Sequence, residues 1–129
     1  MNVTGAEPTW PGDWLRGVLE LCVLGVLADG PTYGYAIAQR LAGAGLGVVK
    51  GGTLYPLLSR LEGEDLVKAT WRAGDGGPGR KFFELTSAGR TELIRRQVLW
   101  SEFVTRTRLL LPAFRDDDEI PQLNHLETR

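Results

Sequence analysis

The chain has 129 residues with a formal net charge of -1, 43% hydrophobic residues, one cysteine and one histidine. This size fits one compact domain with a long element or tail. Cys22 alone excludes a disulfide within the chain, and Cys22 with His125 cannot supply a structural zinc site. The longest apolar run, Leu21 to Ala28, is far shorter than the roughly 18 residues of a membrane span. We therefore expect a cytoplasmic protein without a membrane segment, a metal ion or a cofactor.

The small net charge hides an uneven distribution along the chain. Residues 1–13 carry two acids, and residues 14–115 carry fourteen Lys or Arg against nine Asp or Glu. Residues 116–129 carry five acids and one arginine. The middle of the chain is therefore basic and both ends are acidic. A nucleic-acid partner remains open if the positive charges share one face.

The first half of the chain has the pattern of three short helices. Residues 1–12 are polar and broken by proline, which predicts a flexible N-terminal arm. Asp13 is expected to cap a helix whose apolar residues, Cys22 among them, recur at helical spacing up to the breaker at 29–31. Thr32 is expected to cap a second, shorter helix over about 33–42.

A third helix is expected to open at Gly52 and Thr53, with leucines at 54, 57, 58 and 61 on its inner face. Pro56 falls in the first turn of this helix, where its missing N–H does little harm. The second and third helices are joined by a short glycine-rich turn and have the proportions of a helix-turn-helix.

The pattern then changes to two strands and a final helix. Residues 66–72 and 80–85 read as a hairpin with a glycine-rich tip at 74–79. Thr86 or Ser87 is expected to cap a helix that reaches about Leu111, before Pro112. The predicted fold is mainly α with a small β-hairpin, a winged helix-turn-helix followed by a long C-terminal dimerisation helix. We divide the chain into a flexible arm (1–12), a DNA-binding domain (13–85), a dimerisation helix (86–112) and an acidic flexible tail (113–129).

The last helix is too long to be covered by a domain of this size, yet it is rich in apolar residues. Some of them alternate by four and three along 93, 97, 100, 104, 107 and 111, which is the spacing of a helix–helix seam. We expect a homodimer built on this helix; the alternative is that the helix folds back on its own domain. The expected contact residues on this helix are Leu93, Trp100, Phe103, Val104, Leu110 and Leu111.

Catalysis and nucleotide binding find little support in the sequence. Residues 74–79 match the spacing GxGxxG, but that fingerprint needs a helix after it, and the residues from Arg80 on have strand character. The acids are scattered over predicted helical surfaces, and His125 lies in the tail. We therefore do not expect an enzyme.

The polar side chains left outside by the second and third helices suit DNA. The outward side of the third helix fits a major groove, where its first residues can reach base edges. Hydroxyl groups near the second helix suit phosphate, and cations beside the hairpin tip suit the backbone. The candidate DNA-binding residues from this reasoning are Thr32, Tyr33, Tyr35, Lys50, Thr53, Tyr55, Ser59, Arg60, Arg72, Arg80 and Lys81.

The residues also resemble a known family. The runs LRGVLELCVLGVLADGPTYGYAIAQRL, GGTLYPLLSRLEGEDLV and GPGRKFFELTSAGR, with Trp71 and Trp100, strongly resemble the PadR family of transcriptional regulators over about residues 14–111. The resemblance implies a winged-helix dimer in which the C-terminal helix, joined by Trp14 and Leu15 of the first helix, contacts the partner. It implies that Thr53, Tyr55 and Pro56 lie in the recognition helix.

The same resemblance implies a repressor that binds a palindromic operator in double-stranded DNA and is released by a small molecule. An aromatic or drug-like effector would contact Trp14, Trp100 and Phe103, although aromatic residues at helical spacing also suit a dimer core. The alternative function is a winged-helix ligand-sensing or protein-interaction module that does not itself read DNA. The near-neutral charge and acidic ends motivate this alternative.

Overall fold

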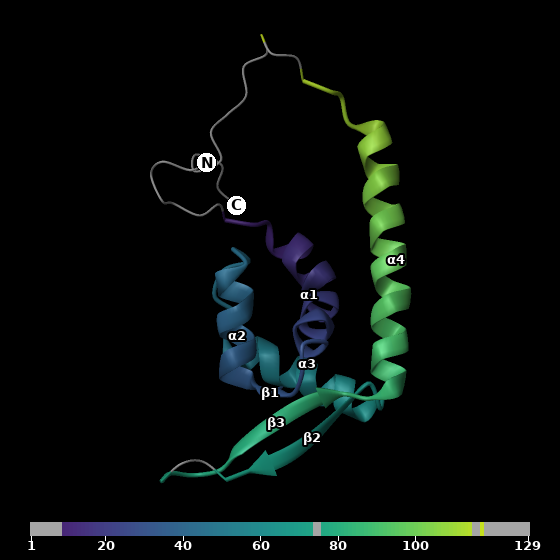
Figure 1. The fold of residues 1–129 in the computed structure, drawn as a ribbon. Helices are drawn as coiled ribbons and strands as arrows, with labels where there is room; N and C mark the ends of the chain where they lie inside the picture. Colours follow the sequence, from purple (N-terminus) through teal and green to yellow (C-terminus); the bar gives the residue numbers. More distant parts are fainter. Residues whose placement is uncertain (1–8, 74–75, 115–116, 118–129) are drawn as a thin grey trace.

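The computed structural model describes residues 9–73, 76–114 and 117, and over these ranges the chain forms four helices and a three-stranded sheet (Figure 1). This is the winged-helix architecture that the sequence predicts, mainly helical with a hairpin. Most of the predicted arm and tail lies outside the described residues. In chain order the elements are α1 (Gly12–Leu27), β1 (Thr32–Tyr33), α2 (Gly34–Gly43), α3 (Gly51–Gly63), β2 (Val67–Arg72), β3 (Arg80–Leu85) and α4 (Ser87–Leu110).

The core lies between the apolar faces of the first three helices and one face of the sheet. Leu24 and Leu27 of α1, Ile37 of α2 and Leu58 of α3 are almost completely buried. Each such side chain contributes about 1.5–3 kcal/mol when removed from water. Helix α1 packs against both α2 and α4, so it is the central element of the domain. Within the described ranges no helix is long and apolar enough to cross a membrane.

The start of α2 differs from the prediction. Thr32 and Tyr33 do not cap and open the helix; they form β1, which pairs with β3 opposite Phe83 and Phe82. The cap position of α2 is Tyr33, in an extended conformation and without a side-chain cap bond. Pairing with β3 holds these two residues in an extended conformation, so α2 starts at Gly34, one residue later than predicted. The sheet therefore has the order β1-β3-β2, one strand more than the predicted hairpin.

Two other helix starts also shift. Helix α1 begins at Gly12 after Pro11, so Asp13 is in the first turn and does not occupy the cap position. Helix α3 begins at Gly51, which places Pro56 inside the helix and beyond its first turn. In an unbroken helix the carbonyl of Gly52 would accept a hydrogen bond from residue 56. Both residues are exposed, so water can reach that carbonyl.

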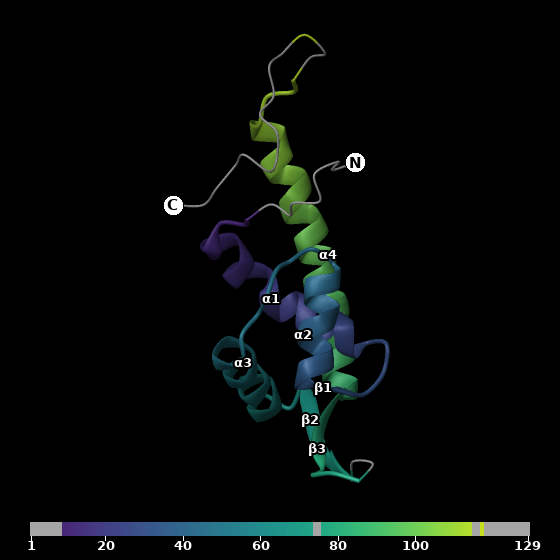
Figure 2. The same cartoon turned by 90° about the vertical axis from the view of Figure 1, so that its left-hand side faces the viewer.

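Helix α4 is anchored at its beginning and leaves the domain along its length. The hydroxyl of Thr86 accepts a hydrogen bond from the amide of Gly89 at 2.9 Å and donates one to the carbonyl of Asp65 at 2.6 Å. A methyl group at Gly89 would lie 1.9 Å from the carbonyl oxygen of Leu66, so only glycine fits at this contact. Figure 2 shows the rest of α4 rising away from the domain, while the hairpin extends from the opposite end.

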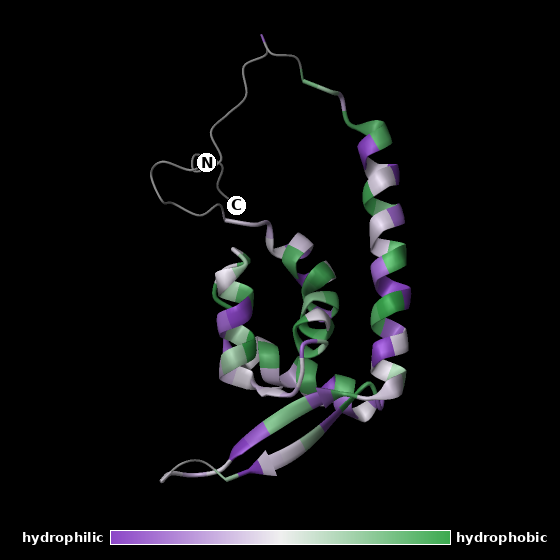
Figure 3. Cartoon of the chain, in the orientation of Figure 1, coloured by the Kyte–Doolittle hydropathy of each residue, from purple (hydrophilic) through white to green (hydrophobic). Residues whose placement is uncertain are grey.

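Leu93 departs from its predicted place in a dimer seam. It lies close to the anchored end of α4, where it is buried with the core of its own chain. Farther along α4 the apolar residues are exposed, and Figure 3 shows them alternating with polar ones. The part of α4 that its own domain leaves uncovered therefore begins after Leu93. Leu93, predicted as a dimer contact, belongs to the core of its own chain.

Candidate nucleic-acid interface

Helix α3 divides cleanly into an inner and an outer face. Leu54, Leu57, Leu58 and Leu61 are buried. Their apolar burial orients the helix so that the intervening positions point to solvent. Six predicted DNA-binding residues are exposed at the start of this helix or along it: Lys50, Thr53, Tyr55, Pro56, Ser59 and Arg60.

Tyr55 is held against the first residue of α2. A methyl group at Gly34 would lie 2.3 Å from the Tyr55 hydroxyl oxygen and 2.6 Å from the ring carbon that carries it. The ring can therefore lie here only because residue 34 has no side chain. Tyr55 remains 49% exposed, so its other side faces solvent beside α3. The glycine thus positions an aromatic hydroxyl group where the two helices of the helix-turn-helix meet.

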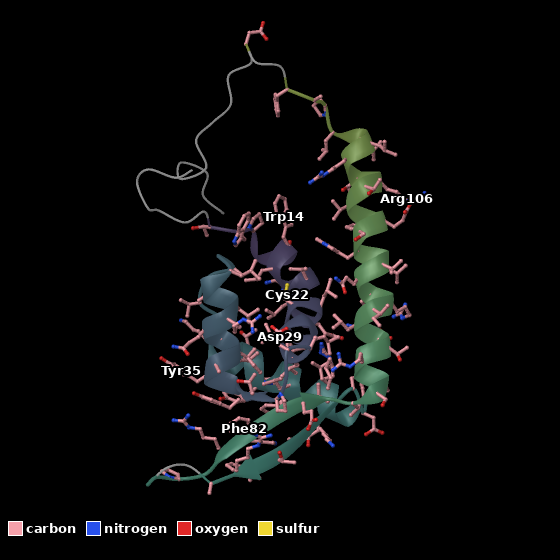
Figure 4. All side chains as sticks on the ribbon, in the orientation of Figure 1. Trp14, Cys22, Asp29, Tyr35, Phe82 and Arg106 are labelled. Atoms are coloured by element: carbon pink, nitrogen blue, oxygen red, sulfur yellow. The ribbon has the colours of Figure 1, made fainter. Side chains whose placement is uncertain are left out.

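The cations of the hairpin are held on aromatic rings. The guanidinium carbon of Arg80 lies 4.5 Å from the centre of the Tyr33 ring, and that of Arg72 lies 4.3 Å from the centre of the Phe82 ring. The two rings are themselves 5.4 Å apart. Stacking of this kind fixes the direction of an arginine side chain and leaves its N–H groups free to donate. Phe82 is marked near the middle of the hairpin in Figure 4.

A hollow of about 420 Å³ lies where the hairpin meets the two helices. Two of its lining residues are cationic and none is acidic. Five of them were predicted as DNA-binding residues: Tyr33, Tyr35, Tyr55, Arg80 and Lys81. We call it the wing hollow; its walls are Tyr33, Gly34, Tyr35, Tyr55, Trp71, Gly79, Arg80 and Lys81.

Trp71 is the wall residue that sequence reasoning did not place in the interface. Alternation along β2 puts it on the same face as Val67 and Ala69, which are buried and half-buried. The hairpin runs past the edge of the core, so Trp71 is 72% exposed. A tryptophan next to the glycine-rich tip, beyond the buried residues of the strand, was the available signal. Its ring adds a large apolar surface beside the cations.

Two predicted DNA-binding cations are paired with carboxylates. Arg60 donates a hydrogen bond to Glu20 of α1, its side chain remains about half exposed, and it does not line the wing hollow. Lys81 lies 3.7 Å from a carboxylate oxygen of Glu62, which ties the hairpin to the end of α3. Arg60 is thus a predicted DNA contact that is also paired with a carboxylate from a distant part of the chain.

Thr32 differs from the other predicted residues, since it is half-buried in β1. Its backbone pairs with β3, and only its partly exposed hydroxyl group remains available to a ligand. The strand fixes Tyr33, the next residue, against the hairpin.

A second, larger hollow lies between the beginning of α1 and the outer part of α4. Its volume is about 770 Å³, and it brings together Trp14, Trp100 and Phe103, the three predicted effector contacts. Trp10 also lines it, and the indole N–H of Trp10 donates to the carbonyl of Gly45 at 2.8 Å. Trp14 is labelled at the end of α1 that is far from the hairpin in Figure 4. We call this space the aromatic hollow.

The described residues offer no cluster of three His, Cys, Asp or Glu side chains that could hold a metal ion. Cys22 is half-buried against the core, and burial raises the pKa of its thiol, which lowers the fraction of reactive thiolate. The glycine-rich tip is followed by strand β3, as the hairpin interpretation requires.

Comparisons with known proteins agree with this geometry. Residues 23–95 match the transcriptional regulator PadR-like family. A transcriptional regulator of Mycobacterium tuberculosis is 36% identical over 63% of this chain and 74% of its own length. A solved PadR-like transcriptional regulator from Bacillus cereus is 33% identical, with a TM-score of 0.72 over 80% of this chain and 100% of that one.

A second solved relative, a PadR family transcriptional regulator from Eggerthella lenta, is 32% identical, with a TM-score of 0.71. That match covers 79% of this chain and 88% of the other. The family match spans the helix-turn-helix, the hairpin and the start of α4, which are the elements that build the interface above. This chain is therefore a member of the PadR-like family of DNA-binding transcriptional regulators.

Proposed function

We propose that this regulator is a repressor that binds a palindromic operator as a homodimer and releases it when an aromatic small molecule binds. The observation that carries the DNA-binding part is the wing hollow beside the exposed face of α3. In this arrangement α3 enters the major groove, with Thr53 and Tyr55 toward base edges. Arg72, Arg80 and Trp71 then contact the sugar–phosphate backbone next to it. We also propose that the protein acts in the cytoplasm, as expected of a regulator of this family.

The dimer is proposed from the exposed apolar residues of α4. Trp100, Phe103, Leu110 and Leu111 are all exposed, and Val104 is half-exposed. A contiguous apolar surface of this kind on a helix is covered by a partner in most soluble proteins. A second copy of the chain offers the same surface, and Trp14 and Leu15 lie next to it on α1. Two-fold symmetry then presents two α3 helices to two half-sites about one turn of DNA apart.

Release by an effector is proposed from the aromatic hollow. Its walls are mainly apolar and aromatic, with Asp13 and Thr107 as polar members, and the Trp100 and Phe103 ring centres lie 6.0 Å apart. A flat aromatic molecule can fill such a space by stacking. Because the hollow lies between α1 and α4, an occupant changes how the long helix meets the domain. A molecule that binds this altered dimer more tightly than the DNA-binding dimer weakens DNA binding. The ratio of its affinities for the two forms of the dimer sets the size of the effect.

A salt titration tests the DNA-binding part directly. The probes are a labelled duplex from the region upstream of this gene and a coding-region duplex of equal length. We expect the upstream duplex to bind at least about a thousandfold more tightly. The logarithm of its affinity should fall with the logarithm of salt concentration with a slope of roughly -0.9 per phosphate contacted. Equal binding of both duplexes would contradict the proposal.

Trp71 provides a residue-level test of the wing hollow. We expect Trp71→Ala to weaken both duplexes by a similar factor, because backbone contacts carry no sequence information. Trp71→Phe is the matched control and should retain most of the affinity, since an aromatic surface remains. A change in sequence preference without a loss of affinity would show that Trp71 is not a backbone contact.

Light scattering and ligand binding test the other two parts. The mass in solution should be twice that of the chain, and Trp100→Asp should lower it, whereas Tyr35→Asp on the DNA face should not. Aromatic ligands should change tryptophan fluorescence and weaken binding of the upstream duplex in the same concentration range. A monomeric wild-type protein would overturn the dimer, and ligand binding without loss of DNA would overturn release.

A further inference from the structure

One carboxylate joins the recognition helix to the long C-terminal helix. Glu20 lies on α1, and its Oε1 accepts a hydrogen bond from the guanidinium group of Arg60 on α3. Its other oxygen, Oε2, accepts from the guanidinium group of Arg96 on α4. The two partners come from positions 40 and 76 residues away in the chain. We call the three residues the Glu20 junction.

The α4 side of the junction is itself held in place. Arg96 also donates from Nε to Glu92, one helical turn earlier, at 2.5 Å. Glu92 accepts two further hydrogen bonds from Arg95, at 3.0 and 2.6 Å. The hydrogen bonds from Arg95 and Arg96 lower the pKa of Glu92 to about 2, so Glu92 stays ionised at neutral pH. Arg96 therefore presents a fixed cation to Glu20.

The Glu20–Arg96 pair is more buried than the surface ion pairs of the domain, whereas Arg60 at the other end is 49% exposed. The side chain of Glu20 is 20% exposed and that of Arg96 is 30% exposed. Arg106 and Glu102, in contrast, are mostly exposed and lie on the same helix. A partly buried pair is screened less by salt than a surface pair. A pair within one helix also cannot fix one helix relative to another, whereas the Glu20 junction spans three.

We propose that Glu20 is a positioning residue for DNA recognition, which fixes α3 relative to α4 through Arg60 and Arg96. The angle of the recognition helix then follows the position of α4, the helix that we expect to form the dimer. Arg60 serves as the α3 end of this link and does not read a base. This inference rests on the proposed function and adds the route by which the long helix controls the DNA-binding surface.

Glu20→Gln is the central variant, because the amide keeps the size of the side chain and removes its charge. Two consequences should follow together. The upstream duplex should bind about tenfold more weakly, since α3 is no longer fixed. The coding-region duplex should bind more tightly, with a salt slope steeper by about one, because the freed Arg60 becomes available to phosphate.

Glu64→Gln is the matched control. It removes the same charge from the position that follows α3, and Glu64 is exposed and makes no ion pair. We expect it to raise the affinity for both duplexes by the same small factor. Arg96→Gln breaks the α4 end alone. It should weaken the upstream duplex without tightening the coding-region duplex, because Arg60 stays paired with Glu20.

The ratio of the two affinities separates positioning from simple stabilisation. All measurements are made well below the melting temperature of each variant, so a merely structural role leaves the ratio unchanged. An unchanged ratio in Glu20→Gln would therefore overturn the proposal. Tighter binding of the upstream duplex by Glu20→Gln would also overturn it, because Arg60 would then be a base-reading residue that Glu20 restrains.

The failure of this inference is distinguishable from the failure of the proposed function. If the wild-type protein prefers the upstream duplex and Glu20→Gln behaves like Glu64→Gln, only the junction is refuted. If the wild-type protein shows no preference, the proposed DNA recognition is refuted first. A double-mutant cycle with Arg60→Gln adds a third readout: the two substitutions together should cost little more selectivity than either one alone.

Discussion

Replacing Gly34 with alanine separates the position of Tyr55 from the stability of the fold. The new methyl group would lie 2.3 Å from the Tyr55 hydroxyl oxygen, whereas an ordinary contact between heavy atoms is about 3.5–4.0 Å. The hydroxyl group must therefore move by more than about 1 Å. The tyrosine ring is half-exposed, so it can swing into solvent without disturbing the core.

The expected effects on folding and on DNA binding have different signs. Alanine favours a helix over glycine by up to about 1 kcal/mol, so the melting temperature should hold or rise slightly. Displacing Tyr55 from the DNA surface should weaken the upstream duplex by about 1–2 kcal/mol, roughly five- to thirtyfold in Kd. Fluorescence anisotropy measures the affinity and thermal unfolding measures the stability. Gly43→Ala is the control, because the other end of α2 has open space for a methyl group.

A double-mutant cycle identifies the cause of the loss. In a Tyr55→Ala background there is no ring to displace, so Gly34→Ala should have little further effect. An equal loss in both backgrounds would refute the reasoning, because the methyl group would then interfere with DNA directly. A fall in melting temperature with Gly34→Ala would also refute it, since the ring would then not be free to move.

Three further predictions concern the anchoring of α4. Gly89→Ala should lower the free energy of unfolding by about 1–3 kcal/mol, because its methyl group overlaps the Leu66 carbonyl. Gly25→Ala is the control, since a methyl group there meets open space. Similar melting curves for the two variants would contradict the clash. Thr86→Ala should lower it by about 1 kcal/mol through loss of the helix cap, whereas Thr86→Ser should restore most of it. The lowered pKa of Glu92 stabilises the fold above about pH 4.5, and this contribution is lost as pH falls toward about 2. Glu92→Gln should therefore show a smaller fall in melting temperature over that range than wild type, and parallel curves would contradict the shift.

The helices and the hairpin were predictable from the sequence because each depends on local patterns. The spacing of Leu54, Leu57, Leu58 and Leu61 defines the inner face of α3, and the cap at Thr86 marks the start of α4. Hydrophobic periodicity states which side of an element is buried. The same periodicity indicates which side faces solvent, so the exposed positions of α3 agree with the prediction.

The features that local pattern did not predict depend on contacts between parts of the chain that are distant in sequence. Thr32 lies in a strand because β3 pairs with it, and Arg60 is tied to α1 because Glu20 accepts its hydrogen bond. Leu93 is core because α4 is still beside the domain at that point, and Trp71 is exposed because the hairpin has passed the edge of the core.

The sequence by itself thus determined the elements, their inner faces and the family to which they belong. The tertiary structure alone decided which cations remain available to DNA and which aromatic residues share a hollow. The physical reason is that periodicity records only whether a side chain faces inward. The choice of partner for Arg60 or Tyr55 is made by contacts between helices, which local pattern does not encode.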